Sequence, residues 1–295
     1  MTEVARLTLL GETLDEVRAT CDREAARARD PVSFVHRYEE TRDREMVGLV
    51  ASSMAFGNVA TIRAKMDEIL KRVGKRPSEA AQSLPKLQHA LAGFKHRVFI
   101  GDDVARLMAG AGALQREHGS LGAAFSARLT EQGAFKDALA DFCESIRAAG
   151  GLNQPNSRRR GPAHILPDVR RGAGSKRLLL FLRWMIRPAD GIDLGVWSVP
   201  PRLLICPVDT HIHKLARNLG FTRRKEVSWR TAEEITAALR RFDPEDPVKY
   251  DFSLCHMGML QRCPSRRDTV RCEGCGVKPV CRHWGAKLVP IRRRK

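Results

Sequence analysis

Apolar residues recur at helical spacing along most of this 295-residue chain, and almost no stretch alternates with the period of a β-strand. Apolar side chains that return every three or four positions fall on one helical face and must be buried against another helix. The sequence therefore predicts an all-α fold. The clearest segments are residues 3–28, 43–55, 59–73, 121–129, 135–146, 212–219 and 231–242, and a last long helix that begins at Asp246-Pro247 and runs into Cys263.

The chain is strongly basic, with 52 Lys and Arg against 34 Asp and Glu, a net charge of +18 and a pI near 10.2. This excess predicts an anionic partner, and nucleic acid is the commonest one. A membrane is not expected, because no apolar run approaches the roughly 18–20 residues of a spanning helix. The N-terminus lacks the charge and apolar core of a signal peptide, so we expect a cytoplasmic, nucleoid-associated protein.

The eight cysteines divide into two sets. Four are scattered among apolar neighbours and are expected to be free, buried thiols: Cys21, Cys143, Cys206 and Cys255. The others form the pattern C-x8-C-x2-C-x5-C within nineteen residues: Cys263, Cys272, Cys275 and Cys281. Four thiolates suit either Zn²⁺ or a [4Fe–4S] cluster. A zinc ribbon usually has two C-x2-C knuckles and this chain has one, which favours the iron–sulfur cluster, with zinc as the alternative.

Arginines interleave with these cysteines, and we expect Arg266 and Arg267 to contact phosphates. A second expected phosphate contact is a glycine-rich turn, Gly172-Ala173-Gly174-Ser175, which opens an apolar helix. Glycines in such a turn let backbone N–H groups converge on an anion, although many helix–turn–helix corners need glycine only for their shape.

Lys176 begins the helix that follows this turn. Arg177 lies beside it, and we expect Arg177 to contact DNA together with the turn. The helix dipole and Arg177 both disfavour a second positive charge there, and the resulting free amine is what a Schiff-base nucleophile requires. The alternative role is a surface lysine that binds phosphate.

Asp209 follows the apolar stretch of residues 203–208 and begins another helix. Its position predicts an N-cap. A carboxylate held there stays ionised and rigid, and it could stabilise a cationic sugar transition state or accept a proton. His211 and His213 flank it, and we favour structural roles over catalytic ones for both.

These three elements, in this order, resemble the endonuclease III superfamily of helix-hairpin-helix DNA glycosylases, over roughly residues 30–284. In that family a hairpin of the type L-P-G-V-G-x-K precedes V-D-T-H, and iron–sulfur members then end in four cysteines after a long helix. Here the stretch from Leu166-Pro167 to Lys176 matches the hairpin, and residues 208–211 (Val-Asp-Thr-His) match the signature around the catalytic aspartate. The chain as a whole is similar to an uncharacterised bacterial branch, known as a domain of unknown function.

The sequence departs from the family pattern in three places. The hairpin is longer, with Asp168 where a glycine is expected and residues 170–173 partly extra. Residues 186–201 look like an insertion, in which the chain is more similar to the archaeal 8-oxoguanine glycosylases. The first cysteine gap is wider than the usual six residues. These departures bear on which substrate the resemblance implies more than on which chemistry it implies.

The resemblance implies a two-lobed helix-hairpin-helix glycosylase fold with a C-terminal four-cysteine loop. A six-helix barrel lobe that contains the hairpin would comprise residues 30–204. Residues 1–29 and 205–284 would form the iron–sulfur lobe, and residues 285–295 a basic tail. Lys176 and Asp209 would face each other across the DNA-binding cleft.

The resemblance further implies a monomeric base-excision enzyme that flips a damaged base out of double-stranded DNA. Lys176 would attack the sugar and act as a β-lyase through a Schiff base, while Asp209 stabilises positive charge. The turn at Phe56-Gly57-Asn58 would supply the wedge, with Asn58 touching DNA, unless Phe56 is simply core. Two alternatives stay open: a non-catalytic DNA-binding protein on the same scaffold, and a zinc-stabilised nucleic-acid-binding module without a pocket.

Overall fold

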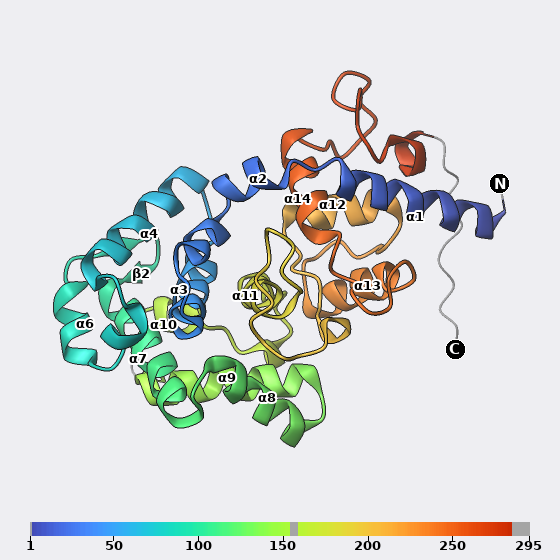
Figure 1. The fold of residues 1–295 in the computed structure, drawn as a ribbon. Coiled ribbons are helices and arrows are strands. Elements are labelled where there is room, and N and C mark those ends of the chain that lie inside the picture. Colours follow the sequence, from blue (N-terminus) through green and yellow to red (C-terminus); the bar gives the residue numbers. More distant parts are fainter. Residues whose placement is uncertain (1, 154–158, 285–295) are drawn as a thin grey trace. The chain divides into compact units, whose positions relative to one another are not determined.

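The computed structural model describes residues 2–153 and 159–284 (Figure 1). The predicted all-α class is confirmed, because the described chain is mainly helical. Its only sheet within those ranges pairs two short antiparallel strands, β1 (Lys95–His96) and β2 (Phe99–Ile100). None of the described helices is long and apolar enough to cross a membrane. The predicted basic tail, residues 285–295, lies outside the described residues.

The chain folds into two compact units. One consists of Arg27–Val199, and the other combines the N-terminal residues up to Ala26 with the chain from Pro200 onward. The first unit shares most of its length with the predicted barrel lobe of residues 30–204. Its elements, apart from the strands, are η1 (Pro31–Arg37), α3 (Thr41–Met54), α4 (Val59–Val73), α5 (Pro77–Ala80), α6 (Leu84–Ala90), α7 (Gly101–His118), α8 (Leu121–Gln132), α9 (Phe135–Gly150), α10 (Gly161–Ile165), η2 (Val169–Arg171) and α11 (Lys176–Ile186).

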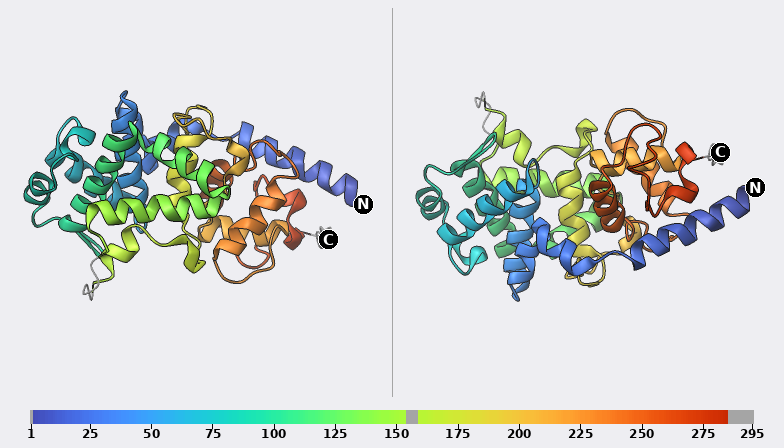
Figure 2. Two further views of the ribbon diagram at one scale, coloured as in Figure 1. Left: turned by 90° about the horizontal axis from the view of Figure 1, so that it is seen from below. Right: turned by 90° about the horizontal axis from the view of Figure 1, so that it is seen from above.

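Two glycines bring α7 and α9 into close contact, and the pair lies side by side in every view (Figures 1 and 2). A Cβ at Gly110 would lie 2.1 Å from the carbonyl oxygen of Ile146, and one at Gly150 would lie 2.1 Å from that of Arg106. Neither helix can therefore carry a side chain at this crossing. Helix α3 is almost entirely buried and packs against η1, α7 and α11.

The other unit is built on the contact between α12 and α14, with α1 packed against α14. Gly258 lets α14 approach α12, since a Cβ there would lie 2.9 Å from the Leu215 side chain. Leu10, Leu14 and Val17 bury the inner face of α1. The helices of this unit are α1 (Glu3–Ala19), η3 (Pro201–Leu203), α12 (Thr210–Leu219), α13 (Trp229–Leu239), α14 (Asp251–Leu260), η4 (Lys278–Val280) and η5 (Arg282–Trp284), and α2 (Arg23–Arg29) connects it to the first unit.

Two predicted helices are shorter than their apolar patterns. Residues 3–28 were predicted as one helix, but α1 ends at Ala19 and α2 begins at Arg23. The break arises because the Asp22 carboxylate accepts a hydrogen bond from the Ala25 N–H and so starts a new helix. The last helix begins at Asp251 rather than Asp246, because the Asp243 carboxylate holds the preceding residues in a turn.

The segment predicted as an insertion, residues 186–201, packs into the first unit through buried polar contacts. The Asp193 carboxylate is buried between two arginines: Arg183 Nε lies 3.1 Å from it, and Arg187 also contacts it. The Trp197 indole donates a hydrogen bond to Glu45 on α3 at 2.8 Å and packs edge-on to Phe181. These contacts hold the segment against α3 and α11.

Candidate functional site

The hairpin between α10 and α11 is anchored by buried apolar residues. Leu166 and Val169 are fully buried, and Arg147 of α9 donates a hydrogen bond to the Leu166 carbonyl oxygen at 2.9 Å. Asp168, at a position where a glycine was expected, caps η2 by accepting from the Arg170 N–H at 3.0 Å. Burial raises the pKa of this carboxyl, but the backbone and guanidinium hydrogen bonds of Arg170 more than offset it, and the pKa is lowered overall. The longer hairpin is thus a well-ordered turn.

The turn from Gly172 to Ser175 contains two left-handed residues. Gly172 has φ 79° and Ser175 has φ 46°. A non-glycine residue in this region is strained by roughly 1–3 kcal/mol, and such residues cluster at functional sites. The Ser175 hydroxyl donates to the Ala173 carbonyl oxygen at 3.2 Å, and the Ser175 backbone leads directly into α11. Lys176 is therefore the first residue of α11, as predicted, and is half-buried.

Arg177 was predicted to contact DNA, but the structure directs its guanidinium into the protein. Nη1 donates to the Ser53 carbonyl oxygen at 2.7 Å, and Nη2 donates to that of His164. The guanidinium also lies over the Phe56 ring, 5.0 Å from its centroid. Burial lowers the pKa of Arg177 to about 10. These contacts connect α11 to the end of α3 and to α10, which is a structural role.

Phe56 belongs to a cluster of aromatic and histidine rings. Its ring centroid lies 5.2 Å from that of His96, 5.1 Å from that of Phe99 and 5.4 Å from that of His164. Phe56 is half-buried, and its packing in this cluster favours the alternative to its predicted role as a wedge. Asn58 is exposed and caps α4, accepting from the Ala60 N–H at 2.9 Å.

Asp209 is the N-cap of α12, as predicted. Its Oδ1 accepts hydrogen bonds from the backbone N–H groups of His211 and Ile212, both at 2.8 Å. Its Oδ2 accepts one from the Cys255 thiol of α14 at 3.4 Å. His213 Nε2 lies 3.0 Å from the carbonyl oxygen of Arg224, which supports the structural role favoured for it. The Asp209 carboxylate is therefore held at both oxygens and is only half-buried.

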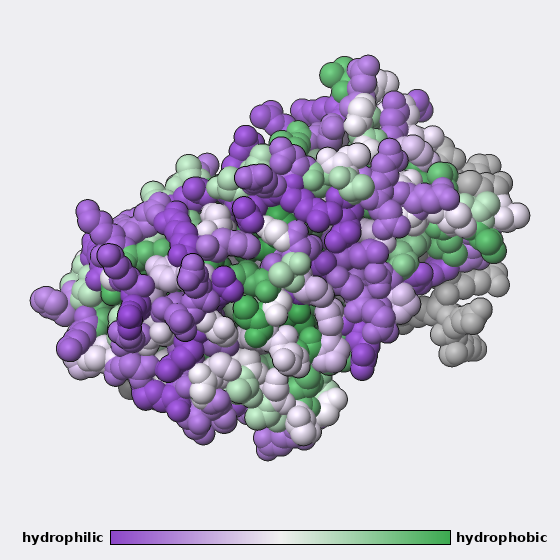
Figure 3. All heavy atoms as spheres, in the orientation of Figure 1, coloured by the Kyte–Doolittle hydropathy of each residue, from purple (hydrophilic) through white to green (hydrophobic). Residues whose placement is uncertain are grey.

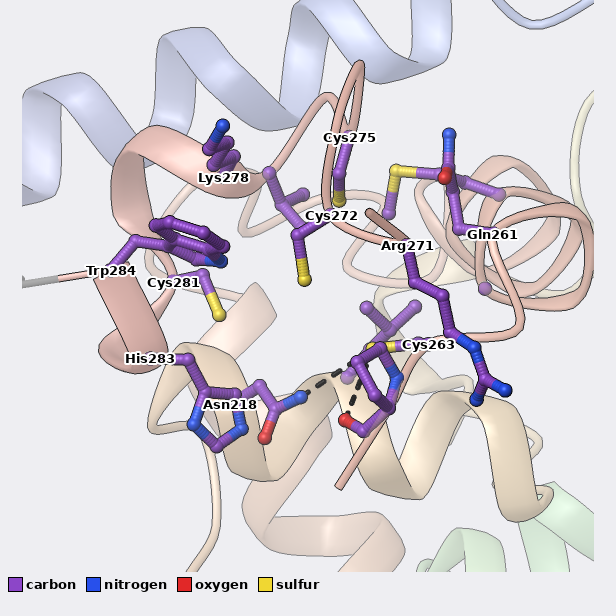
Figure 4. Close-up of a pocket in the computed structure, with 15 residues that line it drawn as sticks. Asn218, Gln261, Cys263, Arg271, Cys272, Cys275, Lys278, Cys281, His283 and Trp284 are labelled. Carbon is purple, nitrogen blue, oxygen red and sulfur yellow. Dashed lines mark hydrogen bonds between the residues drawn. The ribbon is translucent and has the colours of Figure 1, made fainter. Parts of the chain in front are cut away.

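Four of the cysteines line a single pocket at the end of α14 (Figure 4). None of the eight cysteines forms a disulfide. Burial raises the pKa of the Cys263 thiol to about 11. The negative charges of Cys272, Cys275 and Cys281 raise this pKa as well, so the four thiols interact electrostatically. Asn218 of α12 opposes this effect by donating to Cys263 Sγ at 3.4 Å. The four are the predicted ligands Cys263, Cys272, Cys275 and Cys281.

All four thiols line the pocket. Among the described residues, no three His, Cys, Asp or Glu side chains are placed so that they could hold a single metal ion. A tetrahedral zinc site needs sulfur atoms about 3.8 Å apart, given Zn–S bonds of about 2.3 Å. A [4Fe–4S] cluster takes one thiolate at each of four irons, so its ligand sulfurs stand farther apart.

Two further side chains of the pocket carry buried nitrogen atoms without a hydrogen-bond partner among the described residues: His283 Nε2 and Trp284 Nε1. The sequence predicted no role for His283 and Trp284, and it predicted only a free, buried thiol for Cys255, which is half-buried. Nothing in the spacing of Cys255 indicates its contact with Asp209, which depends on how α12 and α14 pack. The available signal for the other two was their position two and three residues after Cys281.

Exposed arginines surround the pocket and the hairpin. Arg266 and Arg267 are exposed, and the Arg267 guanidinium lies 4.2 Å from the centroid of the Trp284 ring. Arg170 and Arg171 are exposed on the hairpin, beside Asp168. The face of the molecule in Figure 3 is largely hydrophilic. These arginine side chains are exposed to solvent and can reach an anionic ligand.

The chain matches one protein family and no curated protein. No curated protein and no solved structure matches the chain. Residues 30–260 match the family DUF2400, described as a protein of unknown function. The match includes Lys176 and Asp209 but ends before the four clustered cysteines. Because the match covers most of the sequence, the chain belongs to the DUF2400 family.

Proposed function

We propose that this protein is a DNA repair glycosylase that flips a damaged base from double-stranded DNA and excises it, with an associated β-lyase activity. The observation that carries the proposal is the hairpin: Gly172 and the strained Ser175 lead directly into α11, with Lys176 at its first position. Backbone N–H groups at such a turn can bind a phosphate, and the next side chain can then reach the sugar. The charge of +18 supports a nucleic-acid ligand.

In this proposal Lys176 is the nucleophile. Its neutral amine attacks C1′ of the flipped nucleotide, the N-glycosidic bond breaks, and the base leaves with the bonding electrons and a proton. The attached nitrogen loses a proton to Asp209, and the C1′–O4′ bond breaks as O4′ takes up that proton, which gives the Schiff base. Loss of a C2′ proton from the Schiff base then eliminates the 3′ phosphate. Asp209 stabilises the positive charge that develops on the sugar and accepts the proton lost by the amine. Its fixation by two N–H groups and a thiol supports the electrostatic role, because a pre-oriented carboxylate need not reorganise.

The proposed DNA contacts are the hairpin, Asn58 and the exposed arginines. Gly172, Gly174 and Ser175 would position one phosphate through their backbone, and Arg266 and Arg267 would bind others. Arg177 is not part of this set, since its guanidinium is held by the protein.

We further propose that the four clustered cysteines hold a [4Fe–4S] cluster, with Zn²⁺ as the alternative. The pocket that all four thiols line supports this assignment. The cluster would hold the arginine-bearing loop in place and take no part in base removal. Anaerobically purified protein should be brown and contain about four irons per chain. Cys272→Ser should lose iron and DNA affinity together, and stoichiometric zinc without iron would refute the assignment.

The decisive test of the function is borohydride trapping on a duplex with one abasic site, combined with base release from a panel of lesion-containing duplexes. The wild type should give a covalent adduct and nick the strand. Lys176→Ala and Lys176→Gln should abolish both and leave duplex binding within a few-fold. Lys86→Ala, a change at an exposed lysine of α6, is the matched control and should behave as the wild type.

Three results would change the proposal. Base release retained by Lys176→Ala, seen as alkali-labile sites, would identify a monofunctional glycosylase that uses water. Duplex binding without trapping or base release by the wild type would leave only the non-catalytic DNA-binding function. No binding to any duplex would refute both.

A further inference from the structure

Two buried hydrogen-bond donors line the cysteine pocket next to each other. His283 and Trp284 belong to η5 (Arg282–Trp284), which directly follows Cys281, and both line the pocket that the four thiols line. Their Nε2 and Nε1 atoms are buried and have no partner among the described residues. In Figure 4 the indole nitrogen of Trp284 lies on the side of the ring that faces Cys281.

An unpartnered buried N–H is unfavourable, so its presence beside a candidate cofactor site indicates that the cofactor accepts its hydrogen bond. The indole nitrogen can only donate, and the thiolates and sulfides of an iron–sulfur cluster are acceptors. The pocket already contains one contact of this kind, from Asn218 Nδ2 to Cys263 Sγ at 3.4 Å. Asn218, His283 and Trp284 thus line the pocket with side-chain nitrogen atoms, and the one from Asn218 donates to a cysteine sulfur.

The Trp284 indole is also held in position. The Arg267 guanidinium lies 4.2 Å from its ring centroid, and the Lys278 ammonium lies 4.5 Å from it. Cations at these distances are attracted to the face of an indole ring. The ring edge that carries the N–H is thus fixed relative to the cysteine loop.

We propose that His283 and Trp284 donate N–H hydrogen bonds to sulfur atoms of the cluster and thereby raise its reduction potential. The proposal rests on the iron–sulfur assignment above and is independent of glycosylase activity. A hydrogen bond to sulfur stabilises the more negatively charged, reduced form more than the oxidised form. Removing a donor should therefore shift the potential of either one-electron couple to a more negative value.

The test uses full-length, iron-loaded protein without DNA. Trp284→Phe keeps the ring and removes its N–H, and His283→Leu removes the imidazole donor. His283→Gln restores an amide N–H close to the position of Nε2. Trp229→Phe is the matched control, because that indole already donates to Glu233 at 2.7 Å and does not line the pocket. The readouts are iron per chain, the reduction potential from a redox titration, and hyperfine coupling to ¹⁵N-labelled tryptophan in the paramagnetic state of the wild type.

We expect ¹⁵N coupling in the wild type that disappears in Trp284→Phe. Potentials should be more negative in Trp284→Phe and His283→Leu, and close to wild type in His283→Gln and in the control. Loss of iron confined to the two donor-free variants would also support the proposal. Wild-type protein with four irons and no ¹⁵N coupling would overturn it, as would equal potentials in all iron-loaded variants. Because no DNA is present, failure of base excision in the separate assay would leave these results unaffected.

Discussion

The two tasks assigned to Asp209 can be separated by substitution. Its Oδ1 caps α12 through two N–H groups, and its charge is proposed to act on the sugar. Asp209→Ser keeps an oxygen that can accept the capping hydrogen bonds and removes the charge. Asp209→Ala removes both.

The structure sets different magnitudes for the two changes. Serine and aspartate are about equal as N-caps, so Asp209→Ser should unfold within about 0.5 kcal/mol of the wild type. Asp209→Ala leaves the N–H groups of His211 and Ile212 without their acceptor and should lose about 1 kcal/mol. Both variants should slow base release by about 10²–10³-fold, as expected when an electrostatic stabiliser of the transition state is removed.

The assay combines urea unfolding, followed by circular dichroism, with single-turnover base release from the best duplex of the lesion panel. Asp22→Ser is the matched control, since Asp22 is an exposed N-cap that accepts from the Ala25 N–H at 3.0 Å. It should change neither quantity appreciably. Base release by Asp209→Ser within a few-fold of the wild type would refute the catalytic role and leave Asp209 as a helix cap. If activity falls in proportion to stability across the two Asp209 variants, the loss of activity is due to unfolding.

Three further predictions follow from the charges and buried groups. Arg266→Ala should reduce the slope of log affinity against log salt concentration by about 0.9, because one phosphate contact is lost. Arg202→Ala changes the net charge equally and should leave the slope unaltered. Equal effects of the two substitutions would show that the DNA contact lies away from the cysteine loop. Asp193→Asn should lower the free energy of unfolding in urea by about 3–5 kcal/mol, because it leaves two buried arginines without their carboxylate. A decrease of less than about 1 kcal/mol would contradict that reasoning. Burial lowers the pKa of both His96 and His164. The stability that they contribute is therefore present above their unfolded-state pKa of 6.5 and is lost as the pH falls through their folded-state pKa values. Replacing both with Phe should flatten the pH dependence of the urea midpoint below pH 6.5.

Interactions between neighbouring residues could be predicted from the sequence. The helical period of the apolar residues indicated the all-α class, and α4 begins and ends at the predicted residues, Val59 and Val73. The cap at Asp209 and the start of α11 at Lys176 were also predictable, because capping depends on neighbouring residues only. Where a nearby side chain competed with the apolar pattern, as Asp22 does, the prediction of one helix over residues 3–28 was wrong.

Contacts between distant side chains depend on how the helices pack. The sequence placed Arg177 and Phe56 in two separate DNA-binding turns. The packing of α3, α10 and α11 brings the Arg177 guanidinium over the Phe56 ring. The Cys255 thiol reaches Asp209 because α12 and α14 cross at Gly258. Such contacts join residues tens of positions apart, and the free energy that selects them comes from burying whole helical faces. No local pattern in the sequence records which faces meet, and so the roles of these side chains could be assigned only from the folded chain.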